Sequence, residues 1–246
     1  MSEFRYTRPD SFPPIVKNLL IINVLVFLAQ LIFSKQYGLT QKLMLRPIIP
    51  EKLRTLLMEE NVLSDSDKFQ PYQIATHMFA HAPTMLFHIL FNMFTLWMFG
   101  RVLENVWGAK RFLLFYLACG IGAAALHLGM QYFRSEQLLE AVLANDGAAI
   151  TKLQGALSPA LGASGAIMGV MAGFAYLFPN SQLYIMFIPF PVKAKYAILG
   201  LMAIDLFGGF ANISGDRIAH FAHLGGALTG LIIVLIWNKT NRKTLY

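Results

Sequence analysis

The sequence predicts an all-α integral membrane protein with six transmembrane helices. Hydrophobic residues make up 56% of the chain, charged residues only 13%, and the mean hydropathy is +0.53, values far from those of soluble proteins. A helix needs roughly 20 mostly apolar residues to cross a bilayer. Six runs approach this length, at about 15–33, 83–100, 111–133, 159–178, 194–210 and 217–237. Since no soluble domain separates them, residues 1–246 are expected to form one membrane domain.

The basic residues predict the orientation of these six spans. An even number of spans puts both termini on one side, and the shorter segments on that side carry most of the Lys and Arg. By the positive-inside rule both termini are then cytoplasmic. Contact with anionic lipid accounts for the net charge of +7, so no nucleic-acid partner is expected. Cys119, the single cysteine, lies inside a span, which excludes a disulfide framework.

Two further segments are expected to lie along the membrane surface. The long outer loop, 34–82, mixes apolar and charged residues at helical spacing over 42–63, which favours an interfacial amphipathic segment. The stretch 184–190 is apolar, but it is too short to span the bilayer and contains Pro189. It is expected to lie against the inner surface.

Polar side chains on three spans are expected at a similar depth. Pro83 and Pro159 are placed like first helical residues, and His88 and Ser164 each follow five residues later. At 1.5 Å per residue, both lie roughly 7–8 Å below the helix start. His223 lies seven residues after the expected start of the sixth span, at roughly 10 Å.

Small residues can bring the fourth and sixth spans together. Glycines recur at every fourth position next to Ser164 and again after His223, and such stripes allow backbones to approach closely. The glycines are Gly165, Gly169 and Gly173 on one span, and Gly226 and Gly230 on the other. Close packing would bring the Ser164 hydroxyl to the His223 imidazole, the base that a serine nucleophile needs.

The second span can supply donors to a developing oxyanion. His88 and Asn92 are four residues apart and share a helix face, and the backbone N–H of Ser164 adds a donor near a helix N-terminus. Nucleophile, base and oxyanion donors together indicate acyl transfer. Three alternatives stay open: Ser164 as packing material, the polar layer as a transport path, and a zinc pair at His77 and His81, which lacks a third ligand.

Four motifs in this order resemble the rhomboid family of intramembrane serine proteases. They are HILFN (88–92), GRVLENVWG (100–108), GASG (162–165) and AHLGGALTG (222–230). The resemblance implies a six-helix rhomboid bundle with a Ser164–His223 dyad, in which His88 and Asn92 serve the oxyanion. It also implies single-pass membrane proteins as substrates, no cofactor and no metal. The expected location is a bacterial plasma membrane.

The chain departs from the family pattern at two places. Pro71 is followed by Tyr72 and Gln73 rather than by a Trp-Arg pair, and Met168 stands where relatives often have an aromatic residue that stacks on the catalytic histidine. A thioether–ring contact could replace that stacking. Asp205 is a candidate for orienting His223, and Glu104 is interpreted as a structural residue at a helix end. A catalytically inactive relative that binds and routes membrane clients is the main alternative function.

Overall fold

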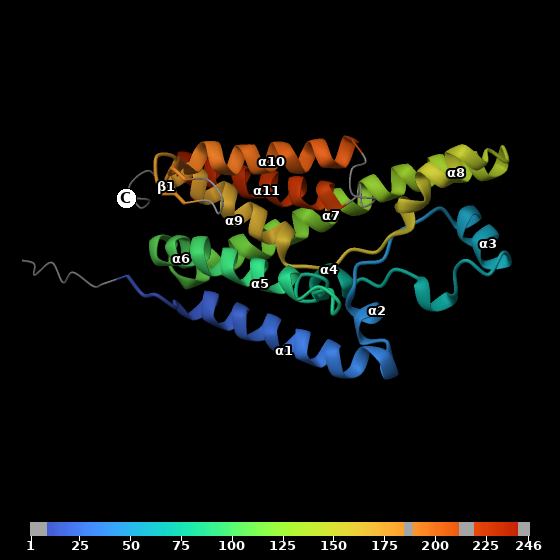
Figure 1. The fold of residues 1–246 in the computed structure, drawn as a ribbon, viewed down its shortest axis with the longest axis horizontal. Coiled ribbons are helices and arrows are strands. Elements are labelled where there is room, and N and C mark those ends of the chain that lie inside the picture. The colour runs from blue at the N-terminus through green and yellow to red at the C-terminus, as the bar shows by residue number, and fades with distance from the viewer. Residues whose placement is uncertain (1–8, 185–188, 212–218, 241–246) are drawn as a thin grey trace, which may run out of the picture.

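The computed structural model describes residues 9–184, 189–211 and 219–240, and these form an elongated bundle of helices (Figure 1). The long helices are α1 (Pro14–Tyr37), α5 (Leu86–Thr95), α7 (Ala109–Leu143), α9 (Ser164–Leu177), α10 (Ala194–Ala211) and α11 (Ala219–Thr240). The short ones are α2 (Leu39–Leu43), α3 (Glu51–Glu59), α4 (Gln73–Thr76), α6 (Arg101–Trp107) and α8 (Gly147–Leu153). The 3-10 turns are Asp65–Asp67 and Gln154–Leu157, and a π-helical turn, Leu96–Gly100, joins α5 to α6.

The helical architecture agrees with the predicted fold class, with one exception. Four described helices are long and apolar enough to cross a membrane: Pro14–Tyr37, Leu86–Trp107, Ala109–Leu143 and His220–Lys239. Two shorter apolar helices, Ser164–Leu177 and Ala194–Ile204, coincide with the fourth and fifth predicted spans. The exception is an antiparallel pair of two-residue strands, β1 (Gln182–Leu183) and β2 (Val192–Lys193), which the all-α prediction missed. The six-span count and the side of the termini stay predictions.

The predicted starts of two spans are wrong. Helix α5 begins at Leu86 instead of Pro83, and α9 begins at Ser164 instead of Pro159. The residues before Ser164 are extended because Ala160 exchanges two backbone hydrogen bonds with Leu45, at 2.7 and 2.9 Å. A pairing partner more than a hundred residues away in sequence therefore overrides the local preference of Pro159 for a helix start. The predicted start of the sixth span, near residue 217, lies outside the described residues.

The third span continues well beyond its predicted end at 133. Helix α7 runs to Leu143, and its last part, together with α8 and α3, extends past the rest of the bundle (Figure 1). Ser135, Leu138 and Ala141 are buried at a spacing of three residues, whereas Glu140 is exposed. This spacing gives the extension one buried face. Composition alone predicted a loop here, because the stretch is too polar to span a bilayer.

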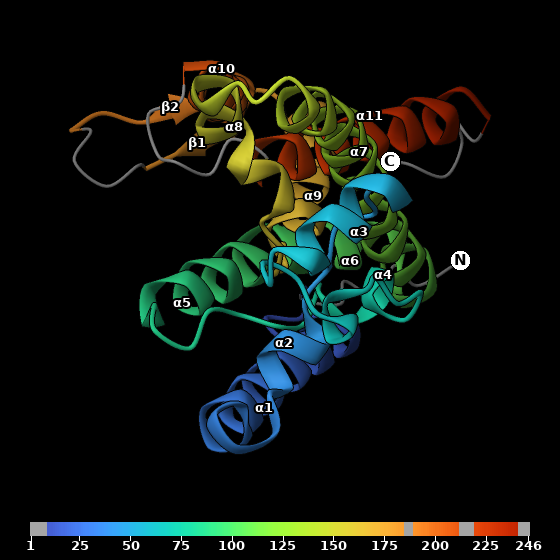
Figure 2. The ribbon, with the colours of Figure 1, turned by 90° about the vertical axis from the view of Figure 1, so that its right-hand side faces the viewer.

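The core of the bundle is formed by α7, α9 and α11, which lie side by side (Figures 1 and 2). The predicted glycine contact between α9 and α11 is confirmed. A Cβ at Gly230 would lie 2.6 Å from the Gly169 carbonyl oxygen, and one at Gly226 would meet the Gly165 carbonyl oxygen. Neither position has room for a side chain, so the two backbones touch.

Glu104 holds the N-terminus of α1. Its carboxylate accepts backbone N–H bonds from Ile15 at 2.8 Å and from Val16 at 2.7 Å. These are first-turn amides without a partner in their own helix, and a negative charge at a helix N-terminus is favourable. Glu104 is buried, with 3% of its surface exposed. Its interpretation as a structural residue at a helix end is confirmed.

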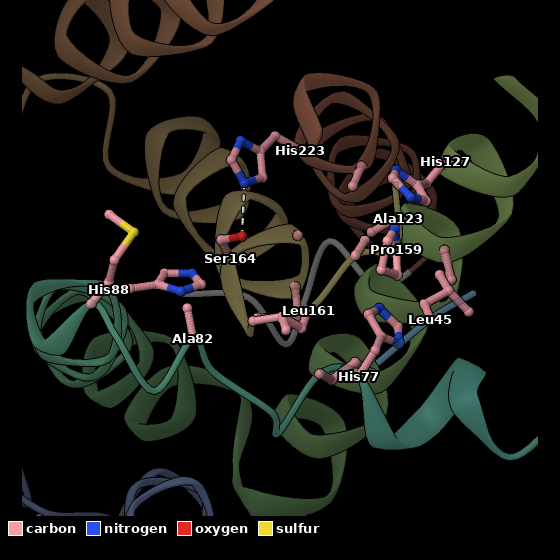
Figure 3. Close-up of a pocket in the computed structure, with 18 residues that line it drawn as sticks. Leu45, His77, Ala82, His88, Ala123, His127, Pro159, Leu161, Ser164 and His223 are labelled. Atoms are coloured by element: carbon pink, nitrogen blue, oxygen red, sulfur yellow. Dashed lines mark hydrogen bonds between the residues drawn. The ribbon is translucent and has the colours of Figure 1, made fainter. Parts of the chain in front are cut away.

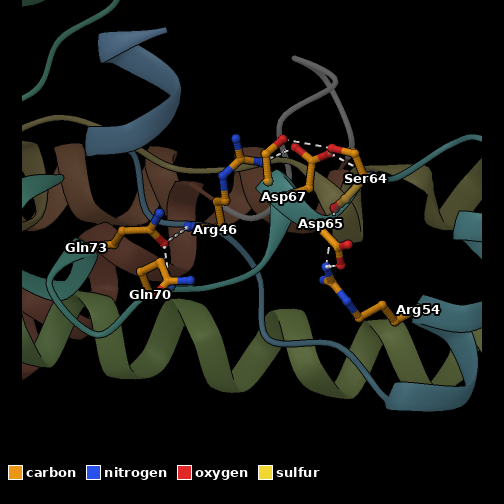
Figure 4. A network of polar contacts seen from close by, with 8 residues as sticks. Arg46, Arg54, Ser64, Asp65, Asp67, Gln70 and Gln73 are labelled. Carbon is orange, nitrogen blue, oxygen red and sulfur yellow. Dashed lines mark hydrogen bonds and ion pairs between the residues drawn. The ribbon is translucent and has the colours of Figure 1, made fainter. Parts of the chain in front are cut away.

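Polar contacts within the protein order the loop 34–82 (Figure 4). Arg46 forms an ion pair with Asp67, and the Gln73 side-chain oxygen accepts backbone N–H bonds from Arg46 and Gln70. The Ser64 hydroxyl donates to Asp67 at 2.6 Å, which lowers the pKa of that carboxyl. The expected amphipathic helix is present only over α3, and its buried residues Leu53 and Arg54 face the protein side of the loop, where α3 packs on α7.

Candidate active site

Ser164 is the first residue of α9 and follows a backbone turn that needs glycine. Gly162 has φ +129°, a conformation that side-chain-bearing residues rarely adopt. Its N–H donates to the His77 carbonyl at 2.9 Å. The Leu45–Ala160 pairing on one side and the start of α9 on the other therefore fix the position of Ser164.

His223 approaches Ser164 from α11. Its Nε2 lies 2.7 Å from Ser164 Oγ (Figure 3), within the range of a short hydrogen bond. The predicted approach of these two side chains is thus confirmed, and it follows from the glycine contact that brings α9 and α11 together. His220, three residues earlier, does not line either cavity beside Ser164.

His88 lies in the first turn of α5 and points toward Ser164 (Figure 3). The space between them lies over Gly162. A Cβ built on Gly162 would be 3.0 Å from His88 Nε2 and 3.6 Å from Ser164 Oγ. Glycine leaves this space open, and an atom that occupied it would contact both a hydroxyl oxygen and an imidazole nitrogen.

Asn92 lies one turn further along α5. Its Nδ2 donates to the His88 carbonyl at 2.8 Å, which leaves its second amide N–H for another acceptor. Asn92 and Met168 line the same cavity as Ser164 and His223. The contact between the Met168 thioether and the His223 ring stays a prediction.

Two cavities meet at Ser164. The first, of about 270 Å³, extends under the segment before Ser164 and reaches Leu45 and His77. The second, of about 650 Å³, is more open and runs between α5, α9 and α10; its walls are mainly apolar, with Phe91, Met171 and Leu201 among them. His88 and His223 border both cavities.

The sequence interpretation missed two polar residues of the first cavity. His77 and His127 both line it (Figure 3), although His77 was considered only as half of a zinc pair and His127 as structural. His77 Nδ1 lies 2.8 Å from the Gln73 carbonyl oxygen, and burial lowers its pKa. Within the described part of the chain, no group of three His, Cys, Asp or Glu residues is suited to hold a metal ion.

His81 lies behind His88, outside the spans. It is fully buried, and its ring meets the His88 ring edge-on with centroids 5.2 Å apart. Burial is the main cause that lowers the pKa of His81 to about 4, and the neighbouring His88 adds to it. Its backbone is held by Gln30 of α1, which donates to the His81 carbonyl and accepts its N–H. The side chain of Asp205, the candidate for orienting His223, lies outside the described residues.

This arrangement defines a class of protein: a multi-pass helical membrane protein with a serine–histidine pair beside a partly apolar cavity. The family model of the rhomboid domain matches residues 68–239, which is more than half of the chain. The chain belongs to the rhomboid family.

Three relatives show how far the similarity extends. The human presenilin-associated rhomboid-like protein, mitochondrial, is 34% identical over 65% of this chain and 38% of its own length. Rhomboid protein 1, mitochondrial, of Saccharomyces cerevisiae is 30% identical over 59% of this chain and 36% of its own length. RHOMBOID-like protein 12, mitochondrial, of Arabidopsis thaliana is 28% identical over 89% of this chain and 56% of its own length. The chain spans well under two thirds of each relative. Since all three are mitochondrial by name, they give no support to the expected bacterial plasma membrane.

Proposed function

We propose that the protein is a serine endopeptidase that hydrolyses peptide bonds in or near the transmembrane segments of single-pass membrane proteins. The observation that carries the proposal is the 2.7 Å separation between Ser164 Oγ and His223 Nε2. A serine hydroxyl is a weak nucleophile on its own and becomes effective when an adjacent base takes its proton. An imidazole is the side chain best suited to this at neutral pH.

The proposed reaction has two stages. Ser164 Oγ attacks the scissile carbonyl while His223 takes the hydroxyl proton, and the oxyanion forms in the space over Gly162. His223 then gives the proton to the leaving amine, and an ester on Ser164 remains. A water molecule then attacks this ester while His223 takes its proton. The ester C–O bond breaks, His223 returns the proton to Ser164 Oγ, and the second product leaves with a new carboxyl terminus. His88, the second amide N–H of Asn92 and the Ser164 backbone N–H are the proposed oxyanion donors.

The segment before Ser164 offers a partner for an extended substrate. Ala160 and Gly162 use their N–H groups on Leu45 and His77. Among the described residues, Leu161 between them has no backbone hydrogen-bond partner for its N–H or carbonyl. Alternate residues of a strand present these groups to opposite edges, so the Leu161 edge can pair with a client backbone. A helical client must unwind to do this, which favours segments with Gly or Pro near the cleavage point.

The decisive experiment compares purified wild-type protein with Ser164→Ala and His223→Ala in liposomes that contain a single-pass substrate. Both variants should lose cleavage at least about a thousandfold, since the groups act as a unit, while thermal unfolding remains that of a folded protein. His220→Ala is the matched control and should retain most activity. A fluorophosphonate should label wild type at Ser164. A wild-type protein that binds the substrate without cutting it would instead support an inactive, client-routing protein.

A further inference from the structure

Positive charge collects at one end of the bundle. The starts of α1, α7 and α10, the end of α11 and the β1–β2 pair lie at the same end of the bundle (Figure 1), and lysine and arginine residues occur at these five positions. These residues, called the basic end below, are Lys17, Lys110, Arg111, Lys193, Lys195 and Lys239. The opposite end, formed by 34–82 and 134–158, carries equal numbers of acidic and basic residues.

The charges of the basic end are not neutralised within the described protein. The carboxylates of the described side chains at this end belong to Asp10 and Glu104. Asp10 accepts the Phe12 N–H, and Glu104 accepts the N–H groups that start α1. Both ion pairs found among the described residues, those of Arg46 and Arg54, lie in the loop 34–82 at the opposite end. The basic end therefore has a net positive charge that an external anion can neutralise.

Aromatic side chains accompany these cations. The Arg101 guanidinium lies 4.1 Å above the Trp97 ring, and Lys195 Nζ lies 5.0 Å from the centre of the Tyr196 ring. Tyr184 and Phe190, which follow β1 and precede β2 in the sequence, are 80% and 62% exposed. Aromatic residues concentrate where a bilayer meets water, so this end combines exposed aromatic rings with positive charges that form no ion pair among the described residues.

We propose that the basic end is a binding surface for anionic phospholipid headgroups. Phosphate is the complementary partner for clustered Lys and Arg, and the exposed aromatic rings place the surface at headgroup depth. A basic residue near an anionic membrane surface strengthens association by about fivefold. Because β2 leads directly into α10, whose Leu201 lines the cavity beside Ser164, bound headgroups also fix the start of one wall of the candidate site.

The chain contains its own probe of this surface. Its three tryptophans, Trp97, Trp107 and Trp237, all lie at the basic end, and the rings of Trp107 and Trp237 are 5.3 Å apart. Brominated acyl chains quench nearby tryptophan fluorescence. The protein is reconstituted in mixtures of phosphatidylcholine with either brominated phosphatidylglycerol or brominated phosphatidylcholine, and the difference in quenching gives the preference for the anionic headgroup.

Two variants, each of which removes four positive charges, make the test specific to the basic end. The basic-end variant replaces Lys110, Arg111, Lys193 and Lys195 with Gln. The loop-end variant replaces the exposed Lys35, Lys42, Lys52 and Lys152 with Gln. The basic-end variant should lose the preference for phosphatidylglycerol by at least about tenfold, and the loop-end variant should keep it. In wild type the preference should also fall as salt is raised.

Two results would overturn the proposal. One is equal quenching of the wild-type protein by the two brominated lipids, and the other is an equal loss of preference in both variants. Thermal unfolding in a neutral detergent shows whether each variant is folded. If the basic-end variant is not, the pairs Lys110→Gln, Arg111→Gln and Lys193→Gln, Lys195→Gln are tested separately, each with an expected loss of preference of about tenfold or more. None of these residues belongs to the proposed catalytic machinery, so the outcome is independent of proteolysis.

Discussion

The two sides of the candidate site are packed in different ways. On one side α9 and α11 touch through their backbones, with Gly226 against Gly165 and Gly230 against Gly169. On the other side, α5 and α10 are separated by the larger cavity and present large apolar side chains outward. Phe87 and Ile204, for example, are 71% and 72% exposed. A contact between backbones has no adjustable side chain, whereas a wall of large exposed side chains can repack.

The difference in packing coincides with a division of roles in the proposed reaction. Ser164 and His223 lie on the tightly packed pair, so their separation is set by backbone geometry. His88 and Asn92 line the larger cavity, called the open side below, through which a client would enter in the proposed reaction. We infer that the nucleophile and its base are held before substrate arrives, and that the open side adjusts to the client. The predictions below challenge this division, beginning with the largest expected effect.

The tight side should not tolerate a side chain at its contact. In Gly226→Leu, the new side chain would meet the Gly165 carbonyl oxygen and force α9 from α11. Overpacking of this kind costs about 1–3 kcal/mol of stability or more, and cleavage should disappear with the Ser164–His223 contact. Unfolding in detergent and cleavage in liposomes measure the two effects.

The matched control for this variant is on the open side. Gly200 of α10 has nothing within 4 Å of a built Cβ, so Gly200→Leu should leave stability unchanged or raise it by up to about 1 kcal/mol through helix propensity. If both substitutions destabilise the protein equally, the two sides are not packed differently and the comparison is wrong.

The second prediction concerns the space over Gly162. Gly162→Ala would place a methyl group 3.0 Å from His88 Nε2, in the proposed position of the oxyanion, at a φ that alanine rarely adopts. The strain should cost about 1–3 kcal/mol of stability, and kcat should fall about a thousandfold. Gly129→Ala on α7, with open space around its Cβ and no unusual φ, should change neither quantity. Normal turnover by Gly162→Ala would show that the oxyanion does not form in this space.

Sequence patterns predicted the tight side better than the open side. The spacing of Gly165, Gly169, Gly226 and Gly230 carries the information that two helices touch, because only glycine allows that contact. The predicted depth of Ser164 and His88 rested on Pro83 and Pro159 as helix starts, and both starts were wrong. Both helices begin later in the sequence than predicted, so Ser164 and His88 still lie near each other: each is within the first turn of its helix.

Long-range contacts explain what the sequence could not predict. The pairing of Leu45 with Ala160 decides where α9 begins, and no local pattern marks it. His77 and His127 are on a loop and on α7, and only the folded chain brings both to the cavity of Ser164. The short strands β1 and β2 have two residues each, too few to produce an alternating pattern.

The third prediction tests the donors on the open side. His88→Ala and Asn92→Ala should lower kcat, by about a hundredfold for His88, with a small change in KM, because an oxyanion donor acts mainly in the transition state. Asn92 should matter less, since one of its amide N–H bonds is already used on the His88 carbonyl. Leu201→Ala, which removes an apolar wall residue, should change KM more than kcat. The assignment of donors fails if His88→Ala and Leu201→Ala alter the same parameter.

The last prediction uses pH to loosen the open side alone. His81 is buried behind His88, and its pKa of about 4 lies below the ordinary histidine value of 6.5. The folded protein therefore binds this proton less readily than the unfolded chain, so the associated stability is complete above about pH 6.5 and is lost as pH falls toward 4. The loss should amount to about 1–3 kcal/mol and should weaken the contact between the His81 segment and Gln30 of α1.

Hydrogen exchange between pH 7.5 and 4.5 should show faster opening of residues 77–95 before α9 and α11 respond. In His81→Phe, which keeps a buried ring without a titrating group, the early opening should disappear. Simultaneous opening of both sides in wild type would mean that the bundle unfolds as one unit and that the open side has no independent freedom.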